Sequence, residues 1–135
     1  MLPQYLHLEI VSPEKLIFSG QVDYVTVPGK DGYLGILPGH APMISELQIG
    51  EIRYKAGLKE GTFSCCMGFV EVLPDSVSVL AQHAEKPGDI DVERARAAKE
   101  RAETRLRSKN PDVDFERAQL ALRRALMRLD VAIRQ

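Results

Sequence analysis

The chain has 135 residues, enough for one ordinary domain or for a compact domain with a small appendage. Hydrophobic residues make up 44% and charged residues 27%, as in soluble globular proteins, and a formal net charge of −1 supplies no global attraction to nucleic acid or membrane. The charge is uneven, because residues 1–88 hold 6 Lys/Arg against 10 Asp/Glu and residues 89–135 hold 12 against 9. An acidic front is therefore joined to a mildly basic tail.

No stretch approaches the roughly 18 apolar residues of a membrane span, and the N-terminus lacks the features of a signal peptide. We therefore predict no direct membrane insertion. Cys65 and Cys66 are adjacent, a spacing that rarely allows a disulfide, and no other cysteine is present to complete a zinc site. They are expected to be reduced, semi-buried strand residues of a cytosolic protein with neither a structural metal nor a redox cofactor.

Short segments with alternating apolar and polar side chains dominate the first 84 residues, separated by breaks rich in Gly and Pro. Residues 60–74 form the longest strand-like run and are expected to cross the core. No helical crossover fits between the segments, so parallel pairing is not expected. The pattern predicts an antiparallel sandwich or barrel, of which we adopt the sandwich. Its clearest strands are residues 5–11, 21–27 and 77–82.

The pattern changes at Pro87-Gly88, after which no glycine occurs. Asp89 and Asp91 are both candidate N-caps for a helix over about residues 92–108, whose Ala, Arg, Glu and Lys favour helix formation. Its alanines recur on one face, which would let a second helix approach closely.

A turn with a second start signal, Pro111-Asp112, precedes a helix expected over about residues 113–133. Two helices joined by so short a turn form an antiparallel hairpin. The predicted fold is therefore α+β, with an N-terminal antiparallel β-sandwich (1–86) followed by a C-terminal antiparallel two-helix hairpin (87–135). Such a hairpin buries little area alone, so it should be marginally stable and should need a surface to pack on.

Catalytic motifs are missing from the sequence. It has no phosphate-loop, dinucleotide, zinc-protease or nucleophile-elbow motif. His7, His40 and His83 are dispersed, and a structural role outweighs metal ligation or proton transfer for each. No nucleophile stands with a base, so we predict that the chain is not an enzyme.

The arginines of the tail are regularly spaced. Arg94 and Arg101 share one face of the first helix, and Arg117, Arg124 and Arg128 share one face of the second. In a folded hairpin the two rows could meet across a groove, where a polyphosphate would relieve their repulsion. The same spacing also suits a solvated surface paired with nearby glutamates, or docking on an acidic partner protein. Spacing alone leaves these three interpretations open.

With this layout in place, the sequence resembles the epsilon subunits of bacterial F-type ATP synthases over nearly its whole length. Residues 34–42, LGILPGHAP, are the most specific part. The other matching segments are VSPEKLIFSG near the start, GFVEVLPDSVSVLAQHAE at the end of the front half, and DIDVERARAAKERAETRL followed by DFERAQLALRRALMRL in the tail.

The resemblance implies a non-catalytic rotor subunit of the central stalk that couples the catalytic head to the c ring. The implied partners are the gamma subunit, the c-subunit ring and the catalytic α and β subunits, and nucleic acid is not among them. The implied place is peripheral, at the cytoplasmic face of the bacterial cell membrane. The loop expected to contact the c ring and gamma holds Tyr33, Leu34, Pro38, Gly39 and His40.

The resemblance also implies a hairpin with two positions. It can fold against the sandwich or extend along gamma, and the extended form inhibits ATP hydrolysis, as a bistable regulatory element would. The basic residues expected to meet an acidic loop of the β subunit are Arg117, Arg123, Arg124 and Arg128.

Some relatives, notably from bacilli, bind ATP on the folded hairpin through an I/L-D-x-x-R-A motif, which stands intact at residues 90–95. The resemblance therefore implies ATP as a regulatory ligand that favours the folded form, and leaves the need for Mg²⁺ open. The residues expected to bind it are Glu85, Ile90, Asp91, Arg94, Ala95, Arg101, Arg117, Arg124 and Arg128.

Three positions depart from the family's pattern. Tyr33 stands where an acidic residue is frequent, residues 66–69 read CMGF in place of a small-residue sequence, and Pro87-Gly88 replaces better helix formers, which suggests a flexible hinge. The alternative class is a free-standing β-sandwich binding module with an unrelated partner, which copurification with gamma would distinguish.

Overall fold

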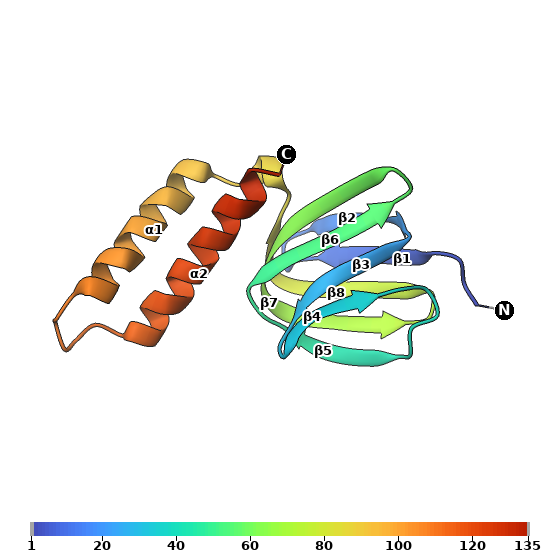
Figure 1. The fold of residues 1–135 in the computed structure, drawn as a ribbon, viewed down its shortest axis with the longest axis horizontal. Helices are drawn as coiled ribbons and strands as arrows, with labels where there is room; N and C mark the ends of the chain where they lie inside the picture. Colours follow the sequence, from blue (N-terminus) through green and yellow to red (C-terminus); the bar gives the residue numbers. More distant parts are fainter. Residues whose placement is uncertain (1, 135) are drawn as a thin grey trace.

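The structure is a computed structural model that describes residues 2–134 (Figure 1). In this part of the chain a domain of eight strands is followed by a short 3-10 helix and two α-helices. The strands are β1 (Leu6–Val11), β2 (Leu16–Val22), β3 (Tyr24–Gly29), β4 (Gly32–Ile36), β5 (Met43–Leu47), β6 (Gly50–Ala56), β7 (Lys59–Leu73) and β8 (Ser76–Glu85). The helical elements are η1 (Pro87–Asp89), α1 (Val92–Arg107) and α2 (Phe115–Ala132).

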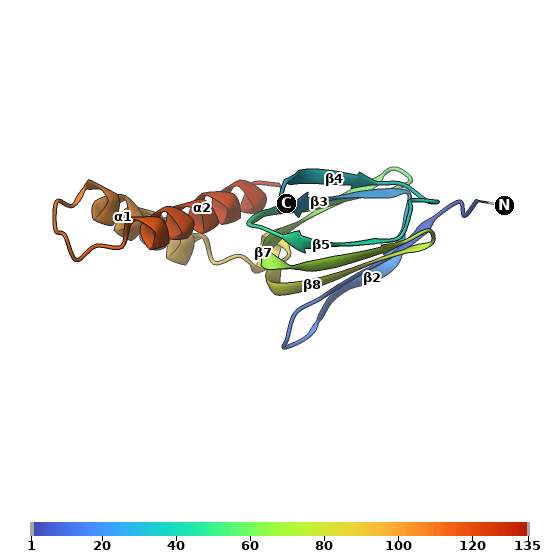
Figure 2. The ribbon, with the colours of Figure 1, turned by 90° about the horizontal axis from the view of Figure 1, so that it is seen from below.

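The strands form a sandwich with its core between two layers (Figure 2). The strand order is β2-β1-β8-β7-β5-β3-β4, with β6 paired to both β3 and β7. Alternating apolar and polar side chains along each strand place every second residue in the core. In β1, for example, Leu6, Leu8 and Ile10 are completely buried, whereas the residues between them are exposed. The predicted fold class, a β-sandwich followed by a helical hairpin, is confirmed.

One strand pair corrects the expectation that parallel pairing would be absent. β1 and β8 run parallel, with His7 opposite Ser76 and Val11 opposite Leu80. The expectation considered only a helical crossover, but here the strands β2 to β7 themselves connect the pair. The other pairs among the described strands are antiparallel, as predicted.

The long strand β7 contains an irregularity at Met67, where the side chains that face the core change from odd-numbered to even-numbered residues. That residue has a φ of 63°, in the left-handed region, and the next residue, Gly68, has a φ of 136°. Before Met67 the odd-numbered residues of β7 face the core, and after it the even-numbered residues do. The register with β8 is kept, because Cys66 lies opposite His83 and Gly68 lies opposite Ala81. The change leaves Cys66 facing away from the sandwich core.

Each α-helix begins at an aspartate. The carboxylate of Asp91 accepts a hydrogen bond from the backbone N–H of Arg94 at 3.0 Å, so Asp91 is the cap of α1. Asp114 caps α2 by accepting from the N–H of Arg117 at 3.1 Å. The second helix therefore starts two residues later than predicted, because Pro111-Asp112 stays in the turn.

The hairpin is folded against the sandwich, with α2 between α1 and the strands (Figure 1). The contact is an apolar cluster separate from the main core, formed by Ile49, Cys66, Ile90, Met127 and Val131. The sandwich thus provides the packing surface that the hairpin was expected to need. None of the described helices is both long enough and apolar enough to span a membrane.

Candidate functional site

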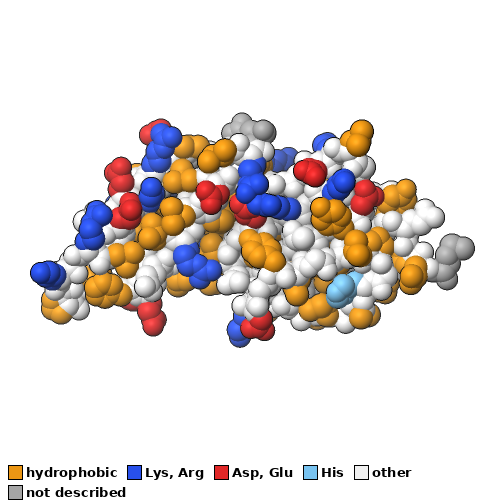
Figure 3. Space-filling view, viewed as in Figure 1, with side chains coloured by type: hydrophobic (Ala, Val, Ile, Leu, Met, Phe, Trp, Pro, Cys, Tyr) orange, Lys and Arg blue, Asp and Glu red, His pale blue; other side chains and the backbone are white. Residues whose placement is uncertain are grey.

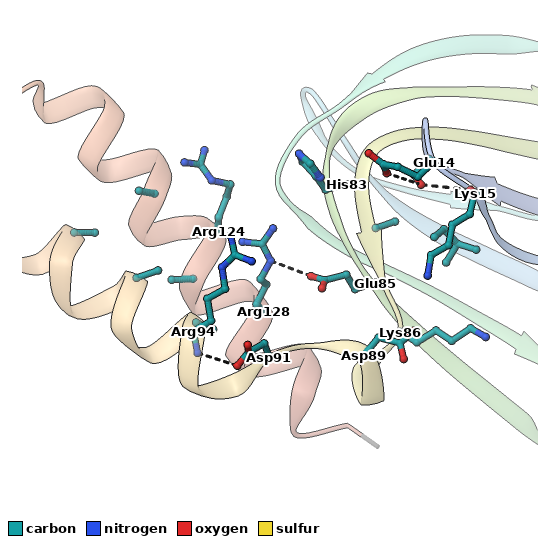
Figure 4. A pocket seen from close by; sticks show the side chains of 18 of the residues that line it. Glu14, Lys15, His83, Glu85, Lys86, Asp89, Asp91, Arg94, Arg124 and Arg128 are labelled. Carbon is teal, nitrogen blue, oxygen red and sulfur yellow. Dashed lines mark hydrogen bonds and ion pairs between the residues drawn. The ribbon is translucent and has the colours of Figure 1, made fainter.

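A cleft of about 740 Å³ lies where the hairpin meets the sandwich (Figure 4). One wall consists of α1 and α2, and the other consists of the β1–β2 turn, the end of β8 and the segment that leads to α1. Small side chains on the helical wall let the two helices pack closely at the back of the cleft. They are Ala95, Ala98 and Ala102 of α1, and Ala121 and Ala125 of α2.

The lining of the cleft is predominantly basic. Four acidic side chains, Glu14, Glu85, Asp89 and Asp91, face seven cationic ones: Lys15, Lys86, Arg94, Arg101, Arg105, Arg124 and Arg128.

Among the described residues, Arg128 alone of these seven cations lies within 4.0 Å of a carboxylate. Six positive side chains without such a partner therefore surround one cavity. Neighbouring like charges repel, and an anion between them removes that cost. The arrangement favours a ligand with several negative charges, and guanidinium groups match phosphate oxygens in geometry.

Arg128 connects α2 to the sandwich. Its Nε donates a hydrogen bond to the Oε1 of Glu85, the last residue of β8, at 3.1 Å. Its Nη2 lies 3.9 Å from the Sγ of Cys66. Burial raises the pKa of the Cys66 thiol, and Arg128 and Arg124 offset part of that rise. Figure 4 shows the Arg94 and Arg128 side chains close together beside Glu85, with Arg124 further along α2.

The structure brings seven of the nine residues predicted to bind ATP to this cleft: Glu85, Asp91, Arg94, Ala95, Arg101, Arg124 and Arg128. Ile90 is outside it, buried in the apolar cluster under α2. Arg117 is also outside it, in the first turn of α2. It shares a helix face with Arg124, but seven residues of helix place it about 10 Å further along the axis.

Sequence reasoning missed several residues of the cleft. Arg105 follows Arg101 by four positions, so the helical spacing could have revealed it. Lys15 lies in the β1–β2 turn, far from the hinge in sequence, and His83 lies in β8, just before the hinge. No helical period connects either residue to the hairpin.

The four arginines predicted to contact the β subunit do not share one face. Arg124 and Arg128 line the cleft, whereas Arg123 lies on another side of α2, where its Nη2 is 3.4 Å from the Oε1 of Gln48. Arg117 is exposed near the start of α2. In the folded form, three of the four are thus close to the sandwich or the cleft.

The predicted contact loop needs correction. Tyr33 and Leu34 lie in strand β4, because residues 32–36 pair with β3, and are not part of a loop. The Tyr33 hydroxyl accepts a hydrogen bond from the N–H of Glu51 at 3.0 Å, at the end of the sandwich that faces the hairpin. Pro38, Gly39 and His40 follow β4 at its other end, where the N–H of Gly39 donates to the β7–β8 turn at 2.7 Å.

Exposed apolar side chains remain on the outer side of the sandwich. Phe69 of β7 and Leu80 of β8 lie opposite each other and are 52% and 55% exposed, and Ile44 of the adjacent β5 is 70% exposed. Figure 3 shows charged side chains along the hairpin and where it meets the sandwich. Within residues 2–134 no three His, Cys, Asp or Glu side chains converge as a metal site would require.

Fold and cleft define a class of protein in which a β-sandwich carries a docked, arginine-lined helical hairpin. Two family models match the same two parts of the chain. The ATP synthase, Delta/Epsilon chain, beta-sandwich domain matches residues 5–87, and the ATP synthase, Delta/Epsilon chain, long alpha-helix domain matches residues 89–132. The chain belongs to the ATP synthase delta/epsilon chain family, as the resemblance predicted.

Individual proteins are similar over most of the chain. The ATP synthase epsilon chain of Koribacter versatilis is 52% identical over 103 residues, which cover 76% of this chain and 72% of the relative. That of Halalkalibacterium halodurans is 52% identical over 101 residues, which cover 75% and 76%. A chain of the Euglena gracilis mitochondrial ATP synthase has the same fold, with a TM-score of 0.83 at 23% identity over 98% of this chain and 84% of that chain.

Proposed function

We propose that this chain is the non-catalytic epsilon subunit in the central stalk of an F-type ATP synthase. Its curated relatives are epsilon chains, and the similar solved chains come from ATP synthase assemblies that contain F1, a central stalk and a c ring. The proposed partners are gamma, the c ring and the catalytic α and β subunits. As part of that assembly, the chain would lie peripherally at the cytoplasmic face of the cell membrane.

The outer face of the sandwich supports contact with another rotor subunit. Ile44, Phe69 and Leu80 form an exposed apolar surface that the hairpin leaves uncovered. A protein partner would remove such a surface from water, and we assign it to gamma. For the c ring, the two ends of β4 offer separate contacts, since Tyr33 and the segment 38–40 lie far apart.

The hairpin would regulate ATP hydrolysis by changing position. In the folded form Arg124 and Arg128 line the cleft and Arg123 lies beside Gln48. The same guanidinium groups cannot also meet an acidic loop of the β subunit, so folding and inhibition exclude each other. The apolar cluster under α2 is small, which suits an element that must be able to leave its docking surface.

ATP would stabilise the folded form by binding in the cleft. The observation that carries this proposal is the set of six cations without a carboxylate partner around a cavity of about 740 Å³. Asp89 and Asp91 lie at the hinge end and would repel phosphates. The triphosphate is therefore expected further along the helices, near Arg101, Arg105 and Arg124.

Calorimetric titration of the isolated subunit with ATP, with and without Mg²⁺, tests the cleft. We expect Arg124→Ala to weaken binding about tenfold, because it removes a charge-assisted hydrogen bond. Arg107→Ala is the matched control, since Arg107 is exposed and does not line the cleft. Failure of the wild type to bind at millimolar ATP would overturn the site, and equal affinity of the two variants would remove Arg124 from it.

Deletion of residues 87–135 tests the regulatory role in the assembled complex. The truncated chain should still copurify with gamma, because the surface assigned to gamma belongs to the sandwich. The complex should then hydrolyse ATP faster than the intact one under inhibiting conditions. An unchanged rate would contradict inhibition by the hairpin, and loss of gamma would contradict the assigned surface.

A further inference from the structure

We propose that Tyr33, Glu51 and Arg134 form a latch that holds the C-terminal end of the hairpin on the sandwich. The latch lies on a different side of α2 from the ATP cleft and works without nucleotide. The inference rests on the proposed function in one respect, namely that the hairpin has a second position to which it can move.

Glu51 is the centre of the latch. It is 9% exposed, and among residues 2–134 no other charged residue is buried. Its Oε2 accepts hydrogen bonds from the Nε and Nη2 of Arg53 at 2.8 and 2.6 Å. Its Oε1 lies 3.5 Å from the Nε of Arg134. A buried carboxylate that lost one of these cations would be left incompletely compensated, so the pair with Arg134 favours the folded form.

Arg134 belongs to the end of the hairpin. It lies two residues after the end of α2, and its backbone N–H donates to the carbonyl of Val131 at 3.0 Å, which ties it to the last turn. Val131 is completely buried in the apolar cluster on the sandwich. The Glu51–Arg134 pair therefore joins strand β6 to a part of the hairpin that must move if α2 undocks.

Tyr33 positions Glu51 through the backbone. Its hydroxyl accepts the N–H of Glu51 at 3.0 Å, although the two residues belong to different strands. Gly50 makes this approach possible, since a Cβ there would lie 2.7 Å from the Tyr33 hydroxyl and 2.6 Å from the Cβ of Pro28. Because Gly50 has no side chain, the Tyr33 hydroxyl can reach the start of β6.

The side chain at position 33 is neutral, which suits its place beside Glu51. A carboxylate would bring a second negative charge close to Glu51 and would compete for its arginines. The hydroxyl instead accepts one hydrogen bond and leaves the Glu51 carboxylate free for Arg53 and Arg134. A neutral hydrogen-bonding residue at position 33 thus fits a latch on the hairpin.

A cavity of about 690 Å³ separates α2 from the sandwich beside these residues, lined among others by Tyr33, Glu51, Arg123 and Arg134. Apolar packing is therefore incomplete on this side of the helix. The Glu51–Arg134 pair adds to the contacts there, which include the hydrogen bond of Arg123 to Gln48. The latch is therefore expected to affect docking although Arg134 is partly exposed.

The labelling rate of Cys66 in the nucleotide-free subunit tests the latch. Cys66 is 3% exposed beneath α2, so a thiol reagent reaches it when the hairpin undocks. We expect Glu51→Gln and Arg134→Gln each to speed labelling about fivefold, and the double variant to be no faster than either. Tyr33→Phe, which removes only the hydroxyl, should speed it by a smaller factor.

Glu46→Gln is the matched control, because it breaks an exposed ion pair with Lys30 that does not touch the hairpin. Denaturant unfolding of each variant checks that the sandwich remains folded. Labelling rates equal to that of Glu46→Gln, or additive effects in the double variant, would overturn the latch. Adding ATP to the wild type tests the cleft separately, since bound ATP should slow the labelling of Cys66. The results for the variants can thus contradict the latch without contradicting the ATP cleft, and a missing effect of ATP can contradict the cleft without contradicting the latch.

Discussion

Glu85 and Arg128 join the two parts of the molecule across 43 positions of sequence, with 3.1 Å between the Oε1 and the Nε. Glu85 ends β8, and Arg128 lies on the helix that packs against β7. The pair is partly buried, with 34% and 29% of the two side chains exposed. The hairpin is thus attached on its cleft side by one ion pair and on its other side by Glu51.

Removing this pair should loosen the hairpin. We expect Glu85→Gln to destabilise the docked hairpin by about 1 kcal/mol, because the charge attraction to Arg128 is lost in a partly buried position. Hydrogen exchange of the α2 amides should quicken while that of β1 and β8 does not. Glu93→Gln is the control, since it breaks the Glu93–Arg96 pair within α1. Equal exchange in both variants would show that Glu85 does not hold α2.

The unpaired cations of the cleft predict a response to anions. Tripolyphosphate should raise the melting temperature of the hairpin more than chloride at the same ionic strength, because it can bridge both arginine rows. Arg105→Gln should reduce that rise by removing one of the cations. Arg107→Gln, outside the cleft, should retain it. A rise that depends on ionic strength alone would point to general screening.

Replacing Met67 by glycine should increase the stability of the sandwich. Its φ of 63° strains a residue with a Cβ, so Met67→Gly should stabilise the sandwich by about 1 kcal/mol. Gly68→Ala should destabilise it by about 3 kcal/mol or more, since a Cβ there would lie 2.1 Å from the carbonyl oxygen of Leu80. Urea unfolding measures both. Destabilisation by Met67→Gly would mean that the side chain contributes more than the strain costs.

The buried thiol of Cys65 should lower the free energy of unfolding at alkaline pH. Burial, with a smaller effect of Cys66, raises the pKa of the Cys65 thiol from 9.0 to about 12. Below pH 9.0 the thiol is protonated in both states and its contribution is complete. Above it the unfolded chain ionises first, so stability falls by up to about 1.4 kcal/mol per pH unit until the folded pKa is reached.

Urea unfolding of the wild type and of Cys65→Ala between pH 8 and about pH 11 isolates this effect, because Tyr and Lys groups titrate equally in both proteins. The wild type should lose more stability with rising pH. Parallel pH profiles would show that Cys65 does not cause the loss. The absolute stability of the variant, lowered by the missing sulfur, does not enter this comparison.

Local signals in the sequence account for most of the predictions that agree with the structure. Asp91 followed by Ala, Arg and Glu was enough to place α1, and helical spacing was enough to bring Arg94, Arg101 and Arg124 to one groove. The second helix start was two residues early, because two turn signals stand close together and only Asp114 forms the cap.

Long-range contacts could not be predicted in this way. Glu51 and Arg134 are far apart in sequence, and nothing in the composition near Glu51 indicates a buried carboxylate. The family resemblance implied a loop at Tyr33, yet the backbone of β4 pairs fully with β3. Lys15 lines the cleft because of how the β1–β2 turn packs, and the periodicity of the sequence does not predict that packing.

The parallel pair of β1 and β8 imposes an order on folding. β1 ends at Val11 and β8 begins at Ser76, so the first strand keeps an open edge until nearly the whole sandwich has been synthesised. Such distant pairing slows folding, and an open edge can recruit another chain. Ile49 and Cys66, which receive α2, are made before the hairpin. Substitutions that prevent docking should therefore leave the rate at which the sandwich forms unchanged.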